Sequence, residues 1–239
     1  MNARELYQAG RLAEAIEALT AEVRSNPTDG QRRTFLFELL CFAGAFDRAG
    51  KQLDVLGQAG QEAAMGMLLY RAALHAEQTR QGMFASEQLP FSTRDPAPVT
   101  GSLNGTPFTS LVDADPRIGA RLEVFAAGEY LWIPFEHVAS IRIEPPKRLR
   151  DLVWAPAIVR PSPGFKGGEL GEVLLPALTP GTWRHENPQV QLGRVTEWHA
   201  LPDGREAPVG QKLLLVDDEE IALLEVRELE FTPVPSAAR

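Results

Sequence analysis

A four-residue motif recurs in this chain at a spacing of 34 residues. Ala9-Gly10-Arg11-Leu12 returns as Ala43-Gly44-Ala45-Phe46, and Ala15 returns as Ala49. The first copy is followed by apolar residues at helical spacing as far as Val23, which predicts an amphipathic helix. The glycine permits a tight turn between two helices, and the small alanine lets the helices approach closely. The repeat therefore predicts two helical hairpins packed side by side.

The period of 34 residues is that of tetratricopeptide repeats. Pro27 ends the first copy, as expected where the second helix of such a repeat stops. A generic pair of helical hairpins is the alternative that this spacing leaves open. Asn2 and Thr28 are predicted helix N-caps, and a capping helix is predicted from Gln61 to about Arg80. The apolar face of that helix is predicted to consist of Met65, Leu68, Leu69, Ala72 and Ala73. Residues 1–86 are thus predicted to form a helical domain with about five helices and one groove.

The chain changes character after Gln88. Prolines and glycines separate short β-rich runs roughly every 8–12 residues, which is typical of a β-rich domain. Together with the helices, this predicts an α+β protein in which residues 87–239 form a partly closed small barrel or a curled antiparallel sheet. Pro90, Pro96 and Pro98 mark a linker or an entry strand, and a short helix is predicted near 149–154. The predicted strands are Thr106–Val112, Arg121–Ala126, Glu129–Pro134, Val138–Ile143, Glu172–Leu175, Val190–Trp198, Lys212–Val216 and Ile221–Phe231.

The charge of −8 is unevenly distributed along the sequence. Residues 1–86 carry nine basic and ten acidic side chains, whereas residues 87–239 carry fifteen and twenty-two. An acidic domain repels phosphate backbones, so nucleic acid is not an expected partner. The one basic cluster, formed by Arg142, Lys147, Arg148 and Arg150, lacks interleaved aromatics and is predicted to be a solvated or partner-facing loop.

Nothing in the sequence predicts a membrane protein or a disulfide-bonded one. The N-terminal residues do not form a signal peptide, and no run approaches the roughly 20 apolar residues of a membrane span. Cys41 is the single cysteine, so an intramolecular disulfide and a multi-cysteine zinc site are excluded. The sequence therefore predicts a cytoplasmic protein.

The residues that commonly carry catalysis do not form a known pattern. None of His75, His137, His185 and His199 has a metal-ligand spacing to another histidine or to Cys41, so we expect surface or packed imidazoles. Cys41 lies in an apolar helical run, where no base is expected beside it. No metal, cofactor or catalytic residue is predicted. A second class of function stays open: an enzyme or small-ligand binder, with its site formed in the β-rich region by Asp113, Asp115, Arg150, Asp151 and Trp154.

Several multi-residue motifs make the chain similar to a known family. In order along the chain they are Gly105-Thr106-Pro107-Phe108, Asp113-Ala114-Asp115-Pro116-Arg117, Gly128-Glu129-Tyr130-Leu131-Trp132, Leu149-Arg150-Asp151-Leu152-Val153-Trp154-Ala155-Pro156, Leu192-Gly193-Arg194 and Gly210-Gln211-Lys212. With the helical repeat in front of them, the whole chain resembles the ImpE family, also called TagJ. These are accessory proteins encoded with bacterial type VI secretion systems.

The resemblance implies a non-enzymatic adaptor. Such a protein binds the small subunit of the contractile sheath through a helix near that subunit's N-terminus. It is also linked to the ClpV-type AAA+ ATPase that disassembles contracted sheaths. By analogy with tetratricopeptide grooves, which hold a helix by its apolar anchors, the repeat register predicts the partner-binding residues. They are Arg4, Tyr7 and Gln8 from the first repeat and Gln31, Thr34, Glu38 and Cys41 from the second.

Overall fold

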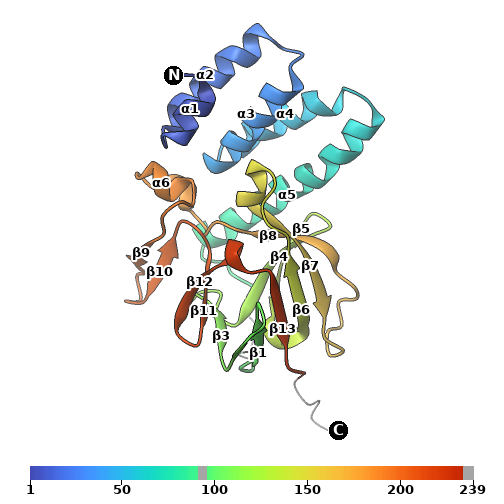
Figure 1. The fold of residues 1–239 in the computed structure, drawn as a ribbon, viewed down its shortest axis with the longest axis vertical. Helices are drawn as coiled ribbons and strands as arrows, with labels where there is room; N and C mark the ends of the chain where they lie inside the picture. The colour runs from blue at the N-terminus through green and yellow to red at the C-terminus, as the bar shows by residue number, and fades with distance from the viewer. Residues whose placement is uncertain (91–95, 234–239) are drawn as a thin grey trace.

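The computed structural model describes residues 1–90 and 96–233. Its first part is helical, as predicted, and stands at one end of the molecule above the strands (Figure 1). Asn2 caps the first helix through a capping box, as predicted. Thr28 does not cap the third helix: the side chain of Asp29 accepts the hydrogen bond from the Arg32 amide instead. The five helices are α1 (Ala3–Gln8), α2 (Leu12–Ser25), α3 (Gly30–Phe42), α4 (Phe46–Gly57) and α5 (Gln61–Ala85).

The 34-residue motif forms the turns of two helical hairpins. Gly10 and Gly44 adopt φ angles of +78° and +64° between α1 and α2 and between α3 and α4. These angles lie in the left-handed region, where glycine has no steric cost. Ala15 and Ala49 are fully buried, so the helices of each hairpin pack closely at these positions. The glycine turns and the close packing at the alanines are therefore as the sequence predicts.

The fifth helix is longer than predicted and its two halves have different surroundings. α5 continues past Arg80 to Ala85, and its second half is packed around Ala73, Leu74 and Ala76. Its first half exposes three of the residues predicted to form its apolar face. The exposed fractions are 67% for Met65, 55% for Leu68 and 53% for Leu69. This half of the helix leaves an apolar strip on the surface of the described structure.

The β region contains one large sheet and two small ones. The eight-stranded sheet is antiparallel and has the order β2-β1-β13-β6-β7-β8-β4-β5, beside a three-stranded sheet β12-β11-β3 and the hairpin β10-β9. Together with the helices it gives the predicted α+β class. The strands are β1 (Gly101–Leu103), β2 (Thr106–Phe108), β3 (Leu111–Asp113), β4 (Arg121–Ala126), β5 (Glu129–Pro134), β6 (Val138–Ile143), β7 (Trp154–Pro161), β8 (Gly171–Pro176), β9 (Glu197–Ala200), β10 (Glu206–Val209), β11 (Leu213–Val216), β12 (Glu219–Ala222) and β13 (Glu228–Phe231).

Three of the predicted strands are wrong, because each of these runs is divided between two or more elements in the structure. The run 106–112 is divided between β2 and β3, and the run 221–231 is divided by a 3-10 turn, η4 (Leu223–Glu225). The run 190–198 begins as a short helix, α6 (Pro188–Gln191), and only its end belongs to β9. Asn187 caps α6 by accepting a hydrogen bond from the Gln189 amide, and proline at the first helical position favours this turn. The short helix predicted near 149–154 is the 3-10 turn η2 (Leu149–Leu152).

The large sheet has an apolar core on each of its faces. In β4, Leu122 and Val124 point into a core inside the β region, whereas Phe125 points toward the helices. This is the two-residue alternation that a strand imposes. The helix-facing core also contains Trp154 of β7 and Leu174 of β8, together with the buried residues of all five helices. The predicted boundary at 86/87 follows α5, but the helices and the sheet share this core.

Within the described ranges, no helix has the length and apolarity needed to cross a membrane. Part of the predicted linker, residues 91–95, lies outside the described residues.

Candidate partner-binding groove

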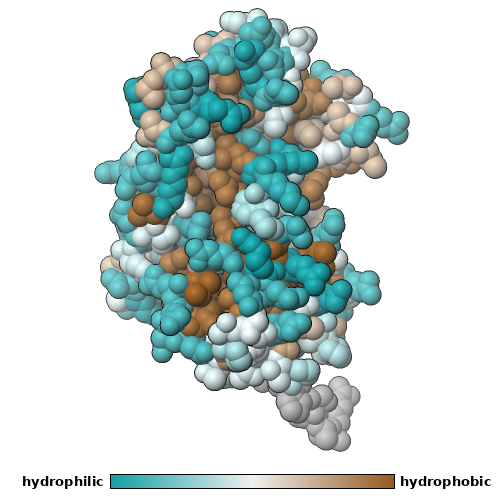
Figure 2. All heavy atoms as spheres, viewed as in Figure 1, coloured by the Kyte–Doolittle hydropathy of each residue, from teal (hydrophilic) through white to brown (hydrophobic). Residues whose placement is uncertain are grey.

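A groove of about 650 Å³ lies between the helical region and the β region. One wall comes from α1 and α3, and the other comes from the segment 146–152, which ends in η2. On the face shown in Figure 2, apolar residues are exposed between these two parts of the molecule. The groove is lined by Arg4, Tyr7, Gln8, Gly30, Gln31, Thr34, Phe35, Glu38, Pro146, Lys147, Arg148, Leu149 and Leu152, and we refer to it as the α1–α3 groove.

Helical spacing places the predicted residues along this groove. Tyr7 and Gln8 follow Arg4 by three and four residues, and Thr34 and Glu38 follow Gln31 by three and seven. Residues at these spacings share one face of a helix. Because α1 and α3 are the first helices of two adjacent hairpins, their corresponding faces lie side by side. Six of the seven residues predicted from the repeat register line the groove.

Cys41 is the exception. Its side chain is buried and lines a small cavity with Glu77 and Arg80, on the side of α3 that faces α5 and loops of the β region. Burial raises the pKa of the Cys41 thiol well above its ordinary value, so the thiol stays protonated. The register prediction is corrected at this position: α3 has turned Cys41 away from the groove into the core.

The groove combines apolar side chains with exposed basic ones. The rings of Tyr7 and Phe35 meet edge to face with centroids 6.1 Å apart, and the Arg4 guanidinium lies 5.5 Å from the centroid of the Phe35 ring. Arg4, Lys147 and Arg148 are exposed. The lining therefore offers apolar contact area flanked by positive charge, although the chain as a whole is acidic.

Glu38, the acidic residue in the lining of the groove, already forms an ion pair within the chain. Oε1 of Glu38 accepts a hydrogen bond from Nη1 of Arg150 at 2.7 Å, and both side chains are largely buried. Burial raises the pKa of Glu38, and the Arg150 guanidinium opposes that rise. Arg150 also lies over the Tyr70 ring, 4.6 Å from its centroid. Since Arg150 balances the charge of Glu38, the remaining charge of the groove lining comes from the basic side chains at its edge.

The second wall of the groove does not follow from the repeat register. The basic cluster at 142–150 is the sequence feature that marks it, because Lys147 and Arg148 of that cluster line the groove. The Asp151 carboxylate shapes this segment by accepting hydrogen bonds from the backbone amides of Lys147 and Arg148, both at 2.9 Å. Arg142 lies apart from the groove and forms an exposed ion pair with Glu228.

The five residues of the alternative hypothesis do not share a cleft. Each one has its own partner in the described structure. Asp113 pairs with Lys212, Asp115 pairs with Arg117 at 2.6 Å, and Arg150 pairs with Glu38. Asp151 binds backbone amides, and the buried Trp154 donates its indole N–H to Glu77 at 3.0 Å. These are structural contacts, and they leave no carboxylate of the set free in a common site.

A buried group of charges fixes the helical region to the sheet. Arg80 of α5 donates to both carboxylate oxygens of Glu123 on β4, at 2.7 and 2.9 Å, and to Glu77 at 3.1 Å. Lys212 lies 2.7 Å from Glu123 and also pairs with Asp113. We call Arg80, Glu77, Glu123, Lys212 and Asp113 the Arg80 network.

The electrostatics of the Arg80 network follow from its burial and its composition. Three carboxylates face two cations, so the network carries one excess negative charge when all its members are ionised. Burial raises the pKa of Asp113 to about 6, against the opposing effect of Lys212. Burial acts the same way on Glu123, but Arg80 and Lys212 outweigh it and hold the pKa of Glu123 well below its usual range. Asp113 therefore takes up a proton before Glu123 does.

A second contact holds the first hairpin against the β region. Arg194, in the segment after α6, donates hydrogen bonds to the backbone oxygens of Tyr7 and Gln8 at 2.9 and 3.0 Å. The two turn glycines lie against the same segment: a Cβ on Gly10 would stand 2.1 Å from Nε2 of Gln189, and a Cβ on Gly44 would stand 2.3 Å from the Trp183 ring. The end of α1, and with it one wall of the groove, is positioned by residues 183–194.

The four histidines have different environments. His75 is exposed on α5, and His137 lies in the 3-10 turn η1 (Phe135–His137). His185 and His199 come together beside Glu197, although the spacing of the two histidines does not predict this. One available signal was the order Glu197-Trp198-His199, because alternation along a strand places its first and third residues on the same face.

Comparisons with known proteins agree with the motifs in the sequence. The profile described as "ImpE protein" matches residues 105–230. The type VI secretion system accessory component TagJ of Pseudomonas aeruginosa is 36% identical, over 98% of this chain and 92% of its own length. The crystal structure of protein VPA1032 from Vibrio parahaemolyticus has the same fold, with a TM-score of 0.83 and 22% identity over 96% of this chain and 97% of that one. The chain therefore belongs to the ImpE family.

Proposed function

We propose that this chain is a non-enzymatic adaptor of a bacterial type VI secretion system and that it acts in the cytoplasm. In this proposal it binds the small subunit of the contractile sheath through a helix near that subunit's N-terminus, and it links the subunit to the ClpV-type AAA+ ATPase. The similarity to TagJ, a type VI secretion accessory component, supports the secretion context. The observation that carries the adaptor mechanism is the α1–α3 groove, which gathers six residues that the repeat register predicts for partner binding.

The lining of the groove suits an amphipathic helix. Such a helix binds in a groove through apolar anchors at spacings of three and four residues. Tyr7, Phe35, Leu149 and Leu152 offer apolar surface to those anchors. The basic side chains at the edge favour a helix whose polar face carries acidic residues, since opposite charges steer association and fix register. We therefore propose that the sheath helix enters between α1, α3 and the segment 146–152.

The proposal is tested by calorimetric titration of the full chain with a peptide covering the N-terminal helix of the cognate small sheath subunit. We expect saturable binding with one peptide per chain. Tyr7→Ala removes an anchor contact, and Arg148→Glu reverses a charge at the exposed edge. Each should weaken binding about tenfold, which corresponds to about 1.4 kcal/mol.

Arg142→Glu is the matched control for the charge reversal. Arg142 belongs to the same basic cluster, is exposed, and pairs with Glu228 outside the groove. Its reversal should leave the affinity unchanged. Equal weakening by Arg142→Glu and Arg148→Glu would indicate general attraction between charges and would contradict a groove-specific site. Absence of binding to both the peptide and the intact subunit would overturn the proposed mechanism.

The link to the ATPase follows from the family resemblance and needs its own test. The full chain, the sheath subunit and the ATPase are mixed in pairs and together, and the complexes are separated by size-exclusion chromatography. A ternary complex, or direct binding of the chain to the ATPase, is expected. Binding of the chain to the sheath subunit alone, with no ATPase recruited, would restrict the proposal to its first half.

A further inference from the structure

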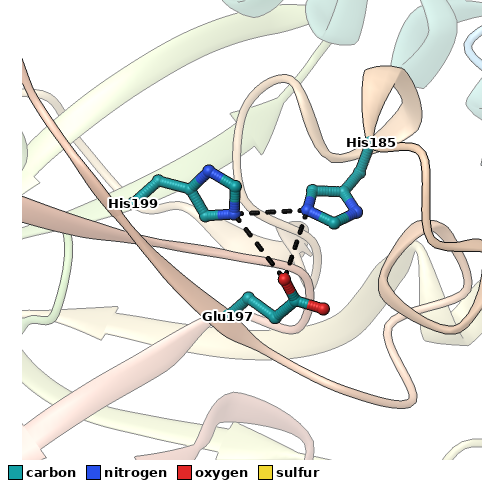
Figure 3. Close-up of side chains that lie close together, drawn as sticks. All are labelled: His185, Glu197 and His199. Atoms are coloured by element: carbon teal, nitrogen blue, oxygen red, sulfur yellow. Dashed lines mark hydrogen bonds and ion pairs between the residues drawn. The ribbon is translucent and has the colours of Figure 1, made fainter.

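His185, Glu197 and His199 point toward one another in the β region, where two segments meet (Figure 3). His185 directly follows η3 (Thr182–Arg184), and the other two residues lie on one face of β9. Nε2 of His185 is 3.2 Å from Nε2 of His199. Oε2 of Glu197 lies 3.5 Å from the first nitrogen and 3.9 Å from the second. Three potential ligand atoms thus form a small triangle.

We propose that these three residues bind one divalent transition-metal ion, with Zn²⁺ as the best-fitting ion. Zinc bonds of about 2.0–2.2 Å in tetrahedral geometry place neighbouring ligand atoms about 3.3–3.5 Å apart. The triangle of 3.2, 3.5 and 3.9 Å is close to one face of such a tetrahedron. Two imidazoles and one carboxylate suit Zn²⁺ and similar ions, whereas Mg²⁺ and Ca²⁺ prefer oxygen ligands.

The carboxylate is oriented for this role by a neighbouring amide. Nδ2 of Asn187 donates to Oε1 of Glu197 at 3.1 Å, which leaves Oε2 directed at the two imidazoles. Contacts of this kind, outside the ligands themselves, fix ligand orientation in metal sites. Asn187 also caps α6 through its side-chain oxygen, so its own position is set by the helix. The carboxylate is therefore held in place before any ion arrives.

One local contact must change when the ion binds. The backbone N–H of Asn187 donates to Nδ1 of His185 at 3.1 Å, so the neutral ring carries its proton on Nε2, directed into the triangle. An ion on Nε2 takes the place of that proton, which moves to Nδ1, and the hydrogen bond from Asn187 is lost. Metal binding is thus coupled to a small rearrangement at residues 185–187.

The position of the site indicates a structural role. The His185 side chain is 14% exposed and the His199 side chain 48%, so one side of the triangle is open to water as a fourth ligand. The ion would join residue 185 to residues 197–199 and so close the loop that carries α6. Arg194 of that loop holds the end of α1. A bound ion would stabilise the contact between Arg194 and the end of α1. This inference does not depend on the partner proposed for the groove.

The test is a titration of metal-free full chain with Zn²⁺ alone, followed by calorimetry, with Co²⁺ absorption as a second reading of coordination geometry. We expect one ion per chain and a rise in the thermal unfolding midpoint on binding, since the ion binds only the folded state. The double variant His185→Ala/His199→Ala should bind at least 100-fold more weakly, and its unfolding midpoint should not respond to Zn²⁺. Glu197→Gln should weaken binding at least tenfold while it retains the shape of the side chain.

His75→Ala is the matched control, because it removes an exposed imidazole from α5 and leaves the triangle intact. It should bind Zn²⁺ like the wild type. The three substituted residues are partly exposed, and circular dichroism checks that the variants fold. The proposal is overturned if the wild type binds no Zn²⁺ at micromolar concentration, or if the double variant binds it as well as the wild type does. The second result would assign the ion to other surface groups.

Discussion

The Arg80 network and the α1–α3 groove both lie between the helical region and the β region, but they differ in exposure to water. In the Arg80 network every charged side chain is buried and has a partner of opposite charge. At the edge of the groove, Arg4, Lys147 and Arg148 are exposed. Buried pairs are costly to break, whereas exposed charges contribute little to folding. The Arg80 network therefore holds the two parts together, whereas the charges at the edge of the groove face solvent.

The largest effect is expected from Arg80→Ala. This change leaves Glu77 buried without its cation and removes one of the two cations that Glu123 has, Arg80 and Lys212. Breaking a buried pair in this way costs about 3–5 kcal/mol. The free energy of unfolding is measured by urea titration with tryptophan fluorescence. Arg71→Ala, on the same helix, removes an exposed ion pair with Asp54 and should cost less than about 1 kcal/mol. Similar losses in the two variants would contradict the distinction between buried and exposed contacts.

The free energy of unfolding should depend on pH, because the Arg80 network carries one excess negative charge when Asp113 is ionised. The pKa of Asp113 is about 6 in the folded chain, above its ordinary value of 3.8. Between these values the folded state retains a proton that the unfolded state has lost. This contribution to stability is therefore complete below about pH 4 and is lost as the pH rises through 6.

Asp113→Asn isolates that effect, because the amide does not titrate. The difference in unfolding free energy between wild type and variant should change by on the order of 2 kcal/mol between pH 4 and pH 7.5, to the disadvantage of the wild type at the higher pH. Urea titrations of both proteins across this range measure it. Parallel pH profiles would show that Asp113 has an ordinary pKa in the folded protein.

Arg150→Ala should give an intermediate result. Arg150 pairs with Glu38 at the bottom of the groove, where both side chains are largely but not completely buried. We expect a loss of about 1–2 kcal/mol, between the values for exposed and buried pairs. Lys147→Ala removes the exposed pair with Glu144 and is the control. A double-mutant cycle with Glu38→Gln separates the energy of the pair from the lost packing of Arg150 on Tyr70.

The smallest effect on stability is expected at the edge of the groove. Arg148→Ala should change the unfolding free energy by less than about 0.5 kcal/mol, and yet weaken binding of the sheath peptide about fivefold. Arg160→Ala removes an exposed arginine of β7 and should change neither quantity. If Arg148→Ala were as destabilising as Arg150→Ala, the edge of the groove would contribute to folding stability. That result would contradict the difference between the Arg80 network and the groove.

The parts of the fold that depend on near neighbours could be predicted from the sequence. The 34-residue motif predicts the hairpin turns at Gly10 and Gly44, and alternation predicts β4, β5 and β6 with their observed bounds. The faces of α1 and α3 follow from helical spacing, which is why six of the seven residues predicted from the repeat register lie together in the groove. For Cys41 the spacing alone is insufficient, because α5 and loops of the β region pack against that side of α3.

The parts that depend on distant contacts could not be predicted. Arg80 meets Glu123 across 43 residues, and no local pattern marks either as the partner of the other. The second wall of the groove arises in the same way, because residues 146–152 pack beside helices more than 100 residues earlier in the chain. The pairing of His185 with His199 spans 14 residues and depends on how the loop that carries α6 folds back. At α6 a short helix stands where the apolar pattern predicts the start of a strand. The cap residue Asn187 and the following Pro188 favour the helix there and outweigh that pattern.

The core that the helices share with the β region is completed late during synthesis of the chain. Arg80 leaves the ribosome before its partner Glu123 and well before Leu178, whose carbonyl oxygen accepts another of its hydrogen bonds at 3.1 Å. During synthesis the finished helices thus expose the apolar face and the arginine that await the sheet, and such surfaces are prone to aggregation. Contacts of this sequence separation also slow folding. The helical region can complete its contacts with the β region only after the segment up to Arg194 has been translated.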